Sequence, residues 1–201
     1  MRGAVGVRPV EAGDLADLTR MMARAFSEDP CFEWVFRGPD RRLGDLELLF
    51  RVAVAVHVPR GISVVTDDRA AAALWAPPDA PEPDESVMGP FGVEMAHTYE
   101  PGDLARLGQF FGLTAQHHPK EPHYYLGVLA ADLGRQGQGL GSACLSTVLQ
   151  RVDADRMPAY LESSNEKNVP LYERHGFRVV EQADLPDGGP PVFFMWRDAV
   201  S

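Results

Sequence analysis

The chain has 201 residues, of which 45% are hydrophobic and 24% charged, and its formal net charge is −10. This size fits one domain with a substantial core. The acidic balance argues against sequence-independent nucleic-acid binding, which depends on Lys and Arg neutralising phosphates. No run of about 18 apolar residues would span a membrane, and residues 1–10 lack the apolar segment of a signal peptide. We expect a single cytoplasmic domain over residues 1–201, a monomer or homodimer without membrane or nucleic-acid partners.

The spacing of apolar residues predicts the elements in chain order. The first half is expected to contain a strand at 7–10, helices at 14–26 and 40–58, strands at 62–66 and 70–76, a proline-rich loop at 77–90 and a helix at 103–117. The second half is expected to contain a strand at 124–131, a loop at 132–138, a helix at 139–152, a strand at 159–162, a short helix at 167–175 and a hairpin of 177–181 with 192–196. This order predicts an α/β (α+β) fold with a mixed sheet of about six to seven strands and helices on both faces.

A glycine cluster stands between the strand at 124–131 and the helix that follows it. Gly137, Gly139 and Gly141 allow the backbone to approach a ligand closely, with amide N–H groups pointing outwards. At a helix N-terminus such a loop is suited to an anion such as a pyrophosphate. It is also compatible with a tight turn, or with a dinucleotide-binding turn in which Glu162 would hold a ribose. The GxGxG spacing and the position late in the chain oppose the dinucleotide reading.

Two motifs together resemble those of the GNAT superfamily of N-acetyltransferases. Gln136-x-x-Gly139-x-Gly141 is similar to its signature Q/R-x-x-G-x-G/A. About thirty residues later, Asn165 precedes Tyr172 by seven positions, and the segment closes on Gly176-Phe177. Within that superfamily the sequence is most similar to puromycin N-acetyltransferase and its actinobacterial relatives. That likeness is carried by Ala25-Phe26, Asp29-Pro30, His118 to Pro122, Gln136 to Ala143, Leu161 to Ser164 and Tyr172 to Arg174, whereas the region from Pro77 to Gln116 differs.

The resemblance implies the GNAT fold, with a splay between two central parallel strands where the pantetheine arm of acetyl-CoA inserts. Residues 122–182 would form the acetyl-CoA-binding half, and acceptor-site elements would lie at about 27–60 and 77–120. The backbone of Leu129, Ala130 and Ala131 would pair with pantetheine, and Asn165 would bond the pantetheine or diphosphate arm. The pyrophosphate would be held by the amides of Gln136, Gly137, Gln138, Gly139, Leu140 and Gly141. Leu133 stands where the family often has proline, which loosens the loop but removes no required group.

The expected reaction is direct attack of a small-molecule amine on the acetyl-CoA thioester in a ternary complex. Tyr172 is the candidate acid for the leaving thiolate, because a phenol titrates near ~10 and a thiol near ~8.5. Glu162 is the candidate base, acting through water, and His118, Glu121 and Tyr124 are alternatives. An N–H near Leu129 would be the oxyanion donor. Tyr172 is also compatible with a packing role, Asn165 with a helix cap, and Glu162 with a carboxylate bonded by nearby amides, although the seven-residue spacing from Asn165 favours the acid role for Tyr172.

The acceptor pocket and the function class leave alternatives open. Aromatic side chains that could line an acceptor pocket are Phe32, Trp34, Phe91, Tyr99 and Phe111. The proline-rich insertion favours a small substrate over a peptide. A protein lysine or N-terminal acetyltransferase and a non-catalytic acetyl-CoA sensor remain the competing functions. Cys31 and Cys144 lie in no CxxC or Cys/His cluster, so the sequence indicates no metal site.

Overall fold

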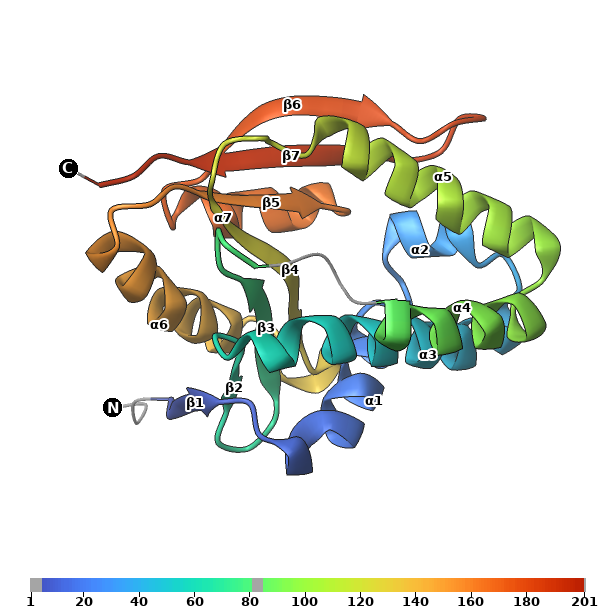
Figure 1. Ribbon diagram of the computed structural model, residues 1–201, viewed down its shortest axis with the longest axis horizontal. Coiled ribbons are helices and arrows are strands. Elements are labelled where there is room, and N and C mark those ends of the chain that lie inside the picture. Colours follow the sequence, from blue (N-terminus) through green and yellow to red (C-terminus); the bar gives the residue numbers. More distant parts are fainter. Residues whose placement is uncertain (1–4, 81–84, 201) are drawn as a thin grey trace.

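The computed structural model describes residues 5–80 and 85–200, which form a central sheet with helices on both faces (Figure 1). The strands are β1 (Val7–Pro9), β2 (Val64–Thr66), β3 (Ala71–Ala76), β4 (Tyr124–Ala131), β5 (Ala159–Ser163), β6 (Arg178–Asp184) and β7 (Pro191–Arg197). The α-helices are α1 (Leu15–Ala25), α2 (Pro30–Val35), α3 (Pro39–His57), α4 (Glu85–Thr98), α5 (Pro101–His117), α6 (Leu140–Ala154) and α7 (Val169–Glu173). Short 3-10 turns are η1 (Ala12–Asp14), η2 (Val58–Arg60), η3 (Leu133–Arg135) and η4 (Glu166–Asn168).

The sheet has seven strands in the order β1-β2-β3-β4-β5-β7-β6. Among the described strands, β4 and β5 run parallel, and every other neighbouring pair is antiparallel. Because parallel strands need a crossover, α6 connects β4 to β5 across one face. The structure confirms the predicted mixed sheet of six to seven strands with helices on both faces.

Two apolar cores lie on the two faces of the sheet. Along β3, Ala72 and Leu74 face the core that contains α1, α2, α3 and α5. Ala71, Ala73 and Trp75 face the core built on α6. This alternation is the period of two expected of a strand buried on both faces. The helices α2, α4 and α5 lie together, and α3 extends from among them to the strands β3 and β4 (Figure 1).

A β-bulge at Gly127, halfway along β4, exchanges the faces of the sheet to which the following side chains point. Leu74 pairs with Val128, but the next β3 residue, Trp75, pairs with Leu126, so Gly127 is left over. The extra residue shifts the alternation of side chains by one. Leu126 accordingly faces the α6 core, whereas Val128, two residues on, faces the opposite core.

The parallel strands β4 and β5 separate just beyond the same point. They pair from Tyr124–Ala159 to Leu126–Leu161 and no further among the described residues. β4 nevertheless continues to Ala131 and β5 to Ser163. The splay expected between the two central parallel strands is therefore present, and it opens at the bulge.

Two helices were absent from the sequence prediction. The aromatic segment after Asp29 forms α2, because Asp29 in an extended conformation accepts bonds from the amides of Cys31 and Phe32 as an N-cap, with Pro30 at N1. The predicted loop at 77–90 is also too long, since α4 begins at Glu85 and contains Pro90. Pro90 lies in the second turn, where it removes one backbone bond near the helix start. Residues 81–84 of that loop lie outside the described part of the chain.

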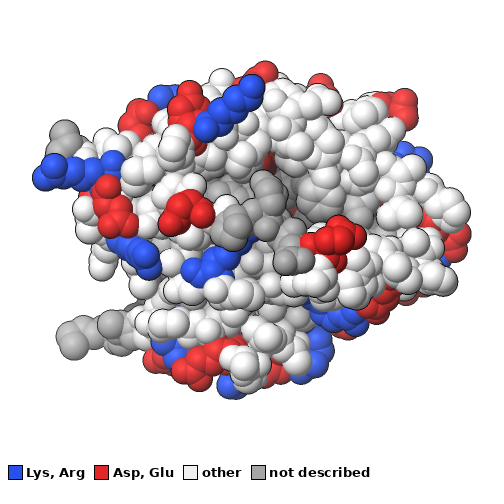
Figure 2. Space-filling view, viewed as in Figure 1, with Lys and Arg blue, Asp and Glu red and all other residues white. Residues whose placement is uncertain are grey.

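Three further features concern the cysteines, possible membrane or metal sites, and the surface charge. Cys31 and Cys144 are buried and free. Within residues 5–80 and 85–200, no helix is long and apolar enough to cross a bilayer, and no cluster of three metal-ligating side chains is found. On the face in Figure 2, basic and acidic side chains are interspersed instead of forming one basic surface.

Candidate active site

A cavity of about 550 Å³ occupies the open end of the splay. It is bordered by the end of β4, the glycine loop and the segment around α7. The residues predicted to hold acetyl-CoA that line it are Leu129, Ala130, Ala131, Gln136, Gly137, Gly139, Leu140, Gly141 and Asn165. Gln138 is not in this lining: its Oε1 accepts a 3.0 Å bond from Nε of Arg135. The structure thus brings together all but one of the residues proposed for the cofactor.

The glycine loop has the backbone conformation that only glycine adopts easily. Gly137 and Gly139 have φ angles of 72° and 84°, in the left-handed region. Gly139 is the N-cap of α6, so the unpaired amides of the first helical turn face the cavity end of the loop. Three basic side chains line the same cavity: Arg135, Lys167 and Arg174. Helix dipole and cations together suit a diphosphate.

Asn165 performs the helix-capping role that the sequence left open as an alternative. Its Oδ1 accepts a 3.1 Å bond from the amide of Lys167, which caps η4. Asn165 also lines the cavity. With Oδ1 engaged, its amide N–H groups are the part of the side chain left to donate to a ligand.

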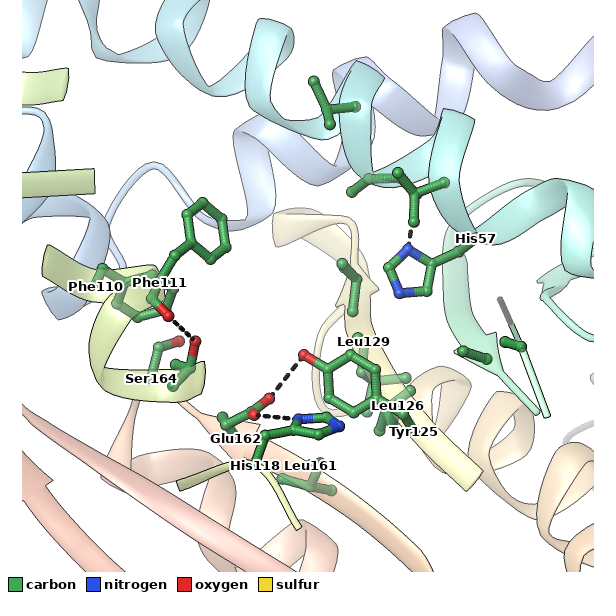
Figure 3. Close-up of a pocket in the computed structure, with 18 of the residues that line it drawn as sticks. His57, Phe110, Phe111, His118, Tyr125, Leu126, Leu129, Leu161, Glu162 and Ser164 are labelled. Atoms are coloured by element: carbon green, nitrogen blue, oxygen red, sulfur yellow. Dashed lines mark hydrogen bonds and ion pairs between the residues drawn. The ribbon is translucent and has the colours of Figure 1, made fainter. Parts of the chain in front are cut away.

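A larger cavity of about 900 Å³ lies between the sheet and the helices α3, α4 and α5 (Figure 3). Most of its lining is apolar or aromatic, including Phe26, Phe32, Phe50, Met88, Met95, Phe110 and Phe111. Of the five aromatic residues expected there, Phe32 and Phe111 line it. Tyr99 instead bonds the carbonyl of Asp45, Phe91 lies under the guanidinium of Arg51, and Trp34 is buried near the β6–β7 turn.

Glu162 lines this larger cavity, and only one of its two carboxylate oxygens accepts a hydrogen bond from a described residue. Tyr125 donates a 2.8 Å bond to Oε2. The other oxygen, Oε1, is buried without a hydrogen-bond partner among the described residues, although Nδ1 of His118 lies 3.5 Å away. Burial, and then the charge of Glu162, raises the pKa of Tyr125, so its hydroxyl stays a donor. Figure 3 shows Tyr125 and His118 converging on this carboxylate.

The alternative bases occupy different positions. His118 and Glu121 line the larger cavity, and His118 contacts Glu162. Tyr124 is not part of the lining: its side chain faces the α6 core, and its hydroxyl donates to Asp155. Tyr124 therefore lies away from the cavity in which a general base would act.

Tyr172 lies where the two cavities meet. Four residues line both: Phe26, Leu129, Asn168 and Tyr172. The Tyr172 ring packs edge-on against Phe177, and only 7% of the residue is exposed. Burial, and then the nearby charge of Asp29, raises the pKa of Tyr172, so the phenol keeps its proton throughout the neutral range. A ligand that passes from one cavity to the other would contact this side chain.

Asp29 is a candidate site residue that the sequence reading missed. It lines the smaller cavity, caps α2, and accepts a 2.7 Å bond from Oγ of Ser164, just after β5. Burial raises its pKa to about 6, although the bonds from Ser164 and two amides oppose the rise. In the sequence the Asp29-Pro30 pair stood out only as part of the likeness to known acetyltransferases, and nothing there indicated that Asp29 would meet Ser164, 135 positions away.

The site combines a loop suited to an anion with a pair of parallel strands that separate beside it. A second cavity, which holds the acid and base candidates, joins the first. This arrangement is typical of an enzyme that transfers a group between two substrates. Residues 92–177 match the family of GNAT acetyltransferases. This match covers less than half of the chain, which has the GNAT fold and is an acetyltransferase. Acetyl-CoA is the acyl donor that the matched family implies.

Solved structures share this fold over nearly the whole chain. A histone acetyltransferase HPA2 and related acetyltransferase from Corynebacterium glutamicum is 26% identical, with a TM-score of 0.71 and coverage of 98% of each chain. A polyamine N-acetyltransferase from Drosophila melanogaster is 18% identical, with a TM-score of 0.66 and coverage of 97% of this chain and 100% of that one. Arylalkylamine N-acetyltransferase 2 from Aedes aegypti is 10% identical, with a TM-score of 0.60 and coverage of 98% and 99%.

Proposed function

We propose that this enzyme transfers the acetyl group of acetyl-CoA to the amine of a small molecule, by direct attack within a ternary complex. The observation that carries the proposal is the meeting of the two cavities at Leu129 and Tyr172. Acetyl-CoA would occupy the smaller cavity with its diphosphate at Gly137 and Gly139. The amine would enter from the larger one. Holding both reactants at one junction supplies much of the rate advantage of such an enzyme.

In this mechanism the amine nitrogen attacks the thioester carbonyl carbon, and the carbon–sulfur bond breaks. Glu162 would accept the amine proton through a water, while Tyr125 donates a hydrogen bond to Oε2. Beyond Leu126 the backbone of β4 is unpaired on the β5 side. An N–H near Leu129 would donate to the developing oxyanion.

Tyr172 would donate its phenolic proton toward the departing sulfur. Its raised pKa favours the protonated phenol. The same rise lowers the driving force for full transfer to a thiolate, whose conjugate acid titrates near ~8.5. Tyr172 is therefore proposed to act by a strong hydrogen bond to sulfur as charge develops, with complete transfer late in the step.

A small acceptor fits better than a peptide. Helices α4 and α5 border the larger cavity, and its lining is mostly apolar. The relatives named for polyamines and arylalkylamines act on small amines, whereas the Corynebacterium relative is named for a histone acetyltransferase. The sequence likeness to puromycin N-acetyltransferases does not extend to the region from Pro77 to Gln116, so it does not identify the acceptor. An amine with a bulky apolar body is the acceptor that we propose.

The test is release of free thiol from acetyl-CoA by the purified protein with a panel of amines. The panel contains puromycin, an arylalkylamine, a polyamine, an aminoglycoside and a lysine peptide. Turnover of an apolar small amine, with none of the peptide, is the expected result. Turnover of the peptide alone would favour a protein acetyltransferase. Binding of acetyl-CoA by calorimetry without turnover of any amine would favour a sensor.

A further inference from the structure

Ser142, in the first turn of α6, lines the smaller cavity but has no role in the mechanism above. Its Oγ lies 2.5 Å from Nε2 of His175, which stands two residues after α7 and 33 positions later in the chain. A hydroxyl inside a helix often bonds a carbonyl one turn earlier, as that of Thr147 does with Ala143. Ser142 instead bonds a side chain from another segment, so a tertiary contact orients its hydroxyl.

The backbone of His175 is fixed by bonds that do not involve its ring. The amide donates a 2.9 Å bond to the carbonyl oxygen of Tyr172. The carbonyl oxygen accepts a 3.0 Å bond from Nε of Arg197 on β7, whose guanidinium also bonds Asp153 on α6 at 2.6 Å. The imidazole can therefore be replaced while the bonds that fix its backbone remain.

The direction of the bond between Ser142 and His175 depends on which ring nitrogen carries the proton. Burial, and then the charges of Arg174 and Arg197, lowers the pKa of His175, which favours the neutral ring. A neutral imidazole donates from one nitrogen and accepts at the other. Nδ1 has no hydrogen-bond partner among the described residues, so no protein contact there selects the tautomer. If Nε2 accepts, the serine proton is directed at the ring; if Nε2 donates, that proton is available to a ligand.

A diphosphate in the smaller cavity would select between these two states. Its oxygens only accept hydrogen bonds, so a hydroxyl that contacts it must donate. Ser142 lines this cavity together with Gly139 and Arg174, beside the unpaired amides of the first turn of α6. The serine has one proton, and the state that suits the ligand directs that proton away from His175. Nε2 of His175 must then carry a proton of its own and donate it to Oγ.

We propose that His175 is a positioning residue for the cosubstrate: its Nε2–H donates to Oγ of Ser142, which in turn donates to the diphosphate of acetyl-CoA. The inference rests on the placement of acetyl-CoA in the smaller cavity under the proposed function. It adds one side-chain donor, with its support, to the backbone amides of residues 136–141. His175 does not line the cavity and acts through the serine.

The first test measures the Kd of CoA by calorimetry. Ser142→Ala is expected to raise Kd about tenfold, and His175→Leu about 3–10-fold, as the loss of one charge-assisted hydrogen bond or of its support predicts. His175→Gln, which restores an N–H donor, should return Kd to within about threefold of wild type. In the Ser142→Ala background, His175→Leu should have little further effect. Effects that add fully in the double variant, or a wild-type Kd in Ser142→Ala, would overturn the proposal.

Two variants control for the loss of a side chain alone. Ser146→Ala removes an exposed hydroxyl one turn further along α6, and His97→Leu removes an exposed imidazole from α4. Neither residue lines either cavity, so both variants should keep the wild-type Kd. Dephospho-CoA, which keeps the diphosphate but lacks the 3′-phosphate, should show the same losses in Ser142→Ala and His175→Leu as CoA does. Undiminished binding of dephospho-CoA by both variants would overturn the assignment to the diphosphate.

A spectroscopic readout separates this positioning role from a purely structural one. In ¹⁵N spectra of the histidine side chains, His175 should carry its proton on Nε2 when the protein is saturated with CoA. An Nδ1–H tautomer in the complex would overturn the inference. Failure of the wild-type protein to bind CoA would overturn both the inference and the proposed function. CoA binding with the expected losses, but without turnover of any amine, would contradict the proposed function alone.

Discussion

A Cβ atom on Gly127 would stand 2.3 Å from Nε2 of His57, closer than two such atoms ever approach. Gly127 does not have a positive φ angle, so its lack of a side chain serves this approach and not a turn. The imidazole of His57, the last residue of α3, can therefore pack against the bulge in β4 only because Gly127 has no side chain.

Gly127→Ala is expected to destabilise the protein by about 1–3 kcal/mol, because the new methyl group overpacks the contact with the imidazole. Urea unfolding measures the change. In a His57→Ala background the same substitution should cost clearly less, because the clashing ring is gone. Costs that simply add in the double variant would show that Gly127 is needed for another reason.

Tyr172→Phe is expected to lower kcat about 10²-fold, the scale of a lost acid. The KM for acetyl-CoA should change little, because the ring and its packing against Phe177 remain. Tyr124→Phe also removes a tyrosine hydroxyl, but one bonded to Asp155 outside both cavities. Thiol release should be near wild type in that control. Full turnover by Tyr172→Phe would remove the tyrosine from the mechanism.

Glu162→Gln is expected to lower kcat/KM about 10²-fold at neutral pH, since the amide cannot take up the amine proton. The deficit should shrink as pH rises, because more of the amine is already neutral. Glu181→Gln on β6, which contacts His117 at 3.4 Å, provides the matched control and should keep full activity. A deficit that stays the same at every pH would indicate that Glu162 only positions the substrate.

Gly139→Ala is expected to weaken acetyl-CoA binding by at least tenfold. The substitution strains a left-handed residue by about 1 kcal/mol and disturbs the first turn of α6. Gly188→Ala imposes comparable strain, at a φ of 71°, in the β6–β7 turn away from the smaller cavity. Calorimetry should find unchanged affinity in that control. Equal affinities for the two variants would argue against the glycine loop as the diphosphate site.

Asp29 is expected to make stability decrease as pH rises from about 4 to 6. Its pKa is raised to about 6 in the folded protein, against ~3.9 in an unfolded chain. Between those values the folded state binds more protons, so each rise in pH favours unfolding. Asp29→Asn keeps a cap for α2 and should flatten the free energy of unfolding over this range. An unchanged pH slope in the variant would contradict the raised pKa.

The order of strands and the glycine loop were predictable because each depends on local patterns: the period of two in β5, the helical period in α6 and the Gly137-x-Gly139 spacing. The helix α2 was missed because it has only six residues and because Phe32, Trp34 and Phe36 stand at every second position, as in a strand. Only the cap by Asp29 indicates a helix. The bulge at Gly127 was not predicted, although a single glycine within a strand is a sign of one. The nearly continuous apolar run of β4 gives no alternation in which the inserted residue would show. Neither the Asp29–Ser164 bond nor the approach of His57 to β4 leaves a local signal, because each joins segments far apart in the chain.

Because the β4–β5 pairing ends early, the protein without its cosubstrate has unpaired backbone groups inside the sheet. Where two strands part, each presents unpaired amide and carbonyl groups, as a strand at the outer edge of a sheet does. Such groups are templates for a foreign strand. Acetyl-CoA, with its own amides, would cover them, so CoA-depleted protein should associate more readily at high concentration than protein saturated with the cosubstrate. The molecule that supplies the acetyl group would then also protect its enzyme from aggregation.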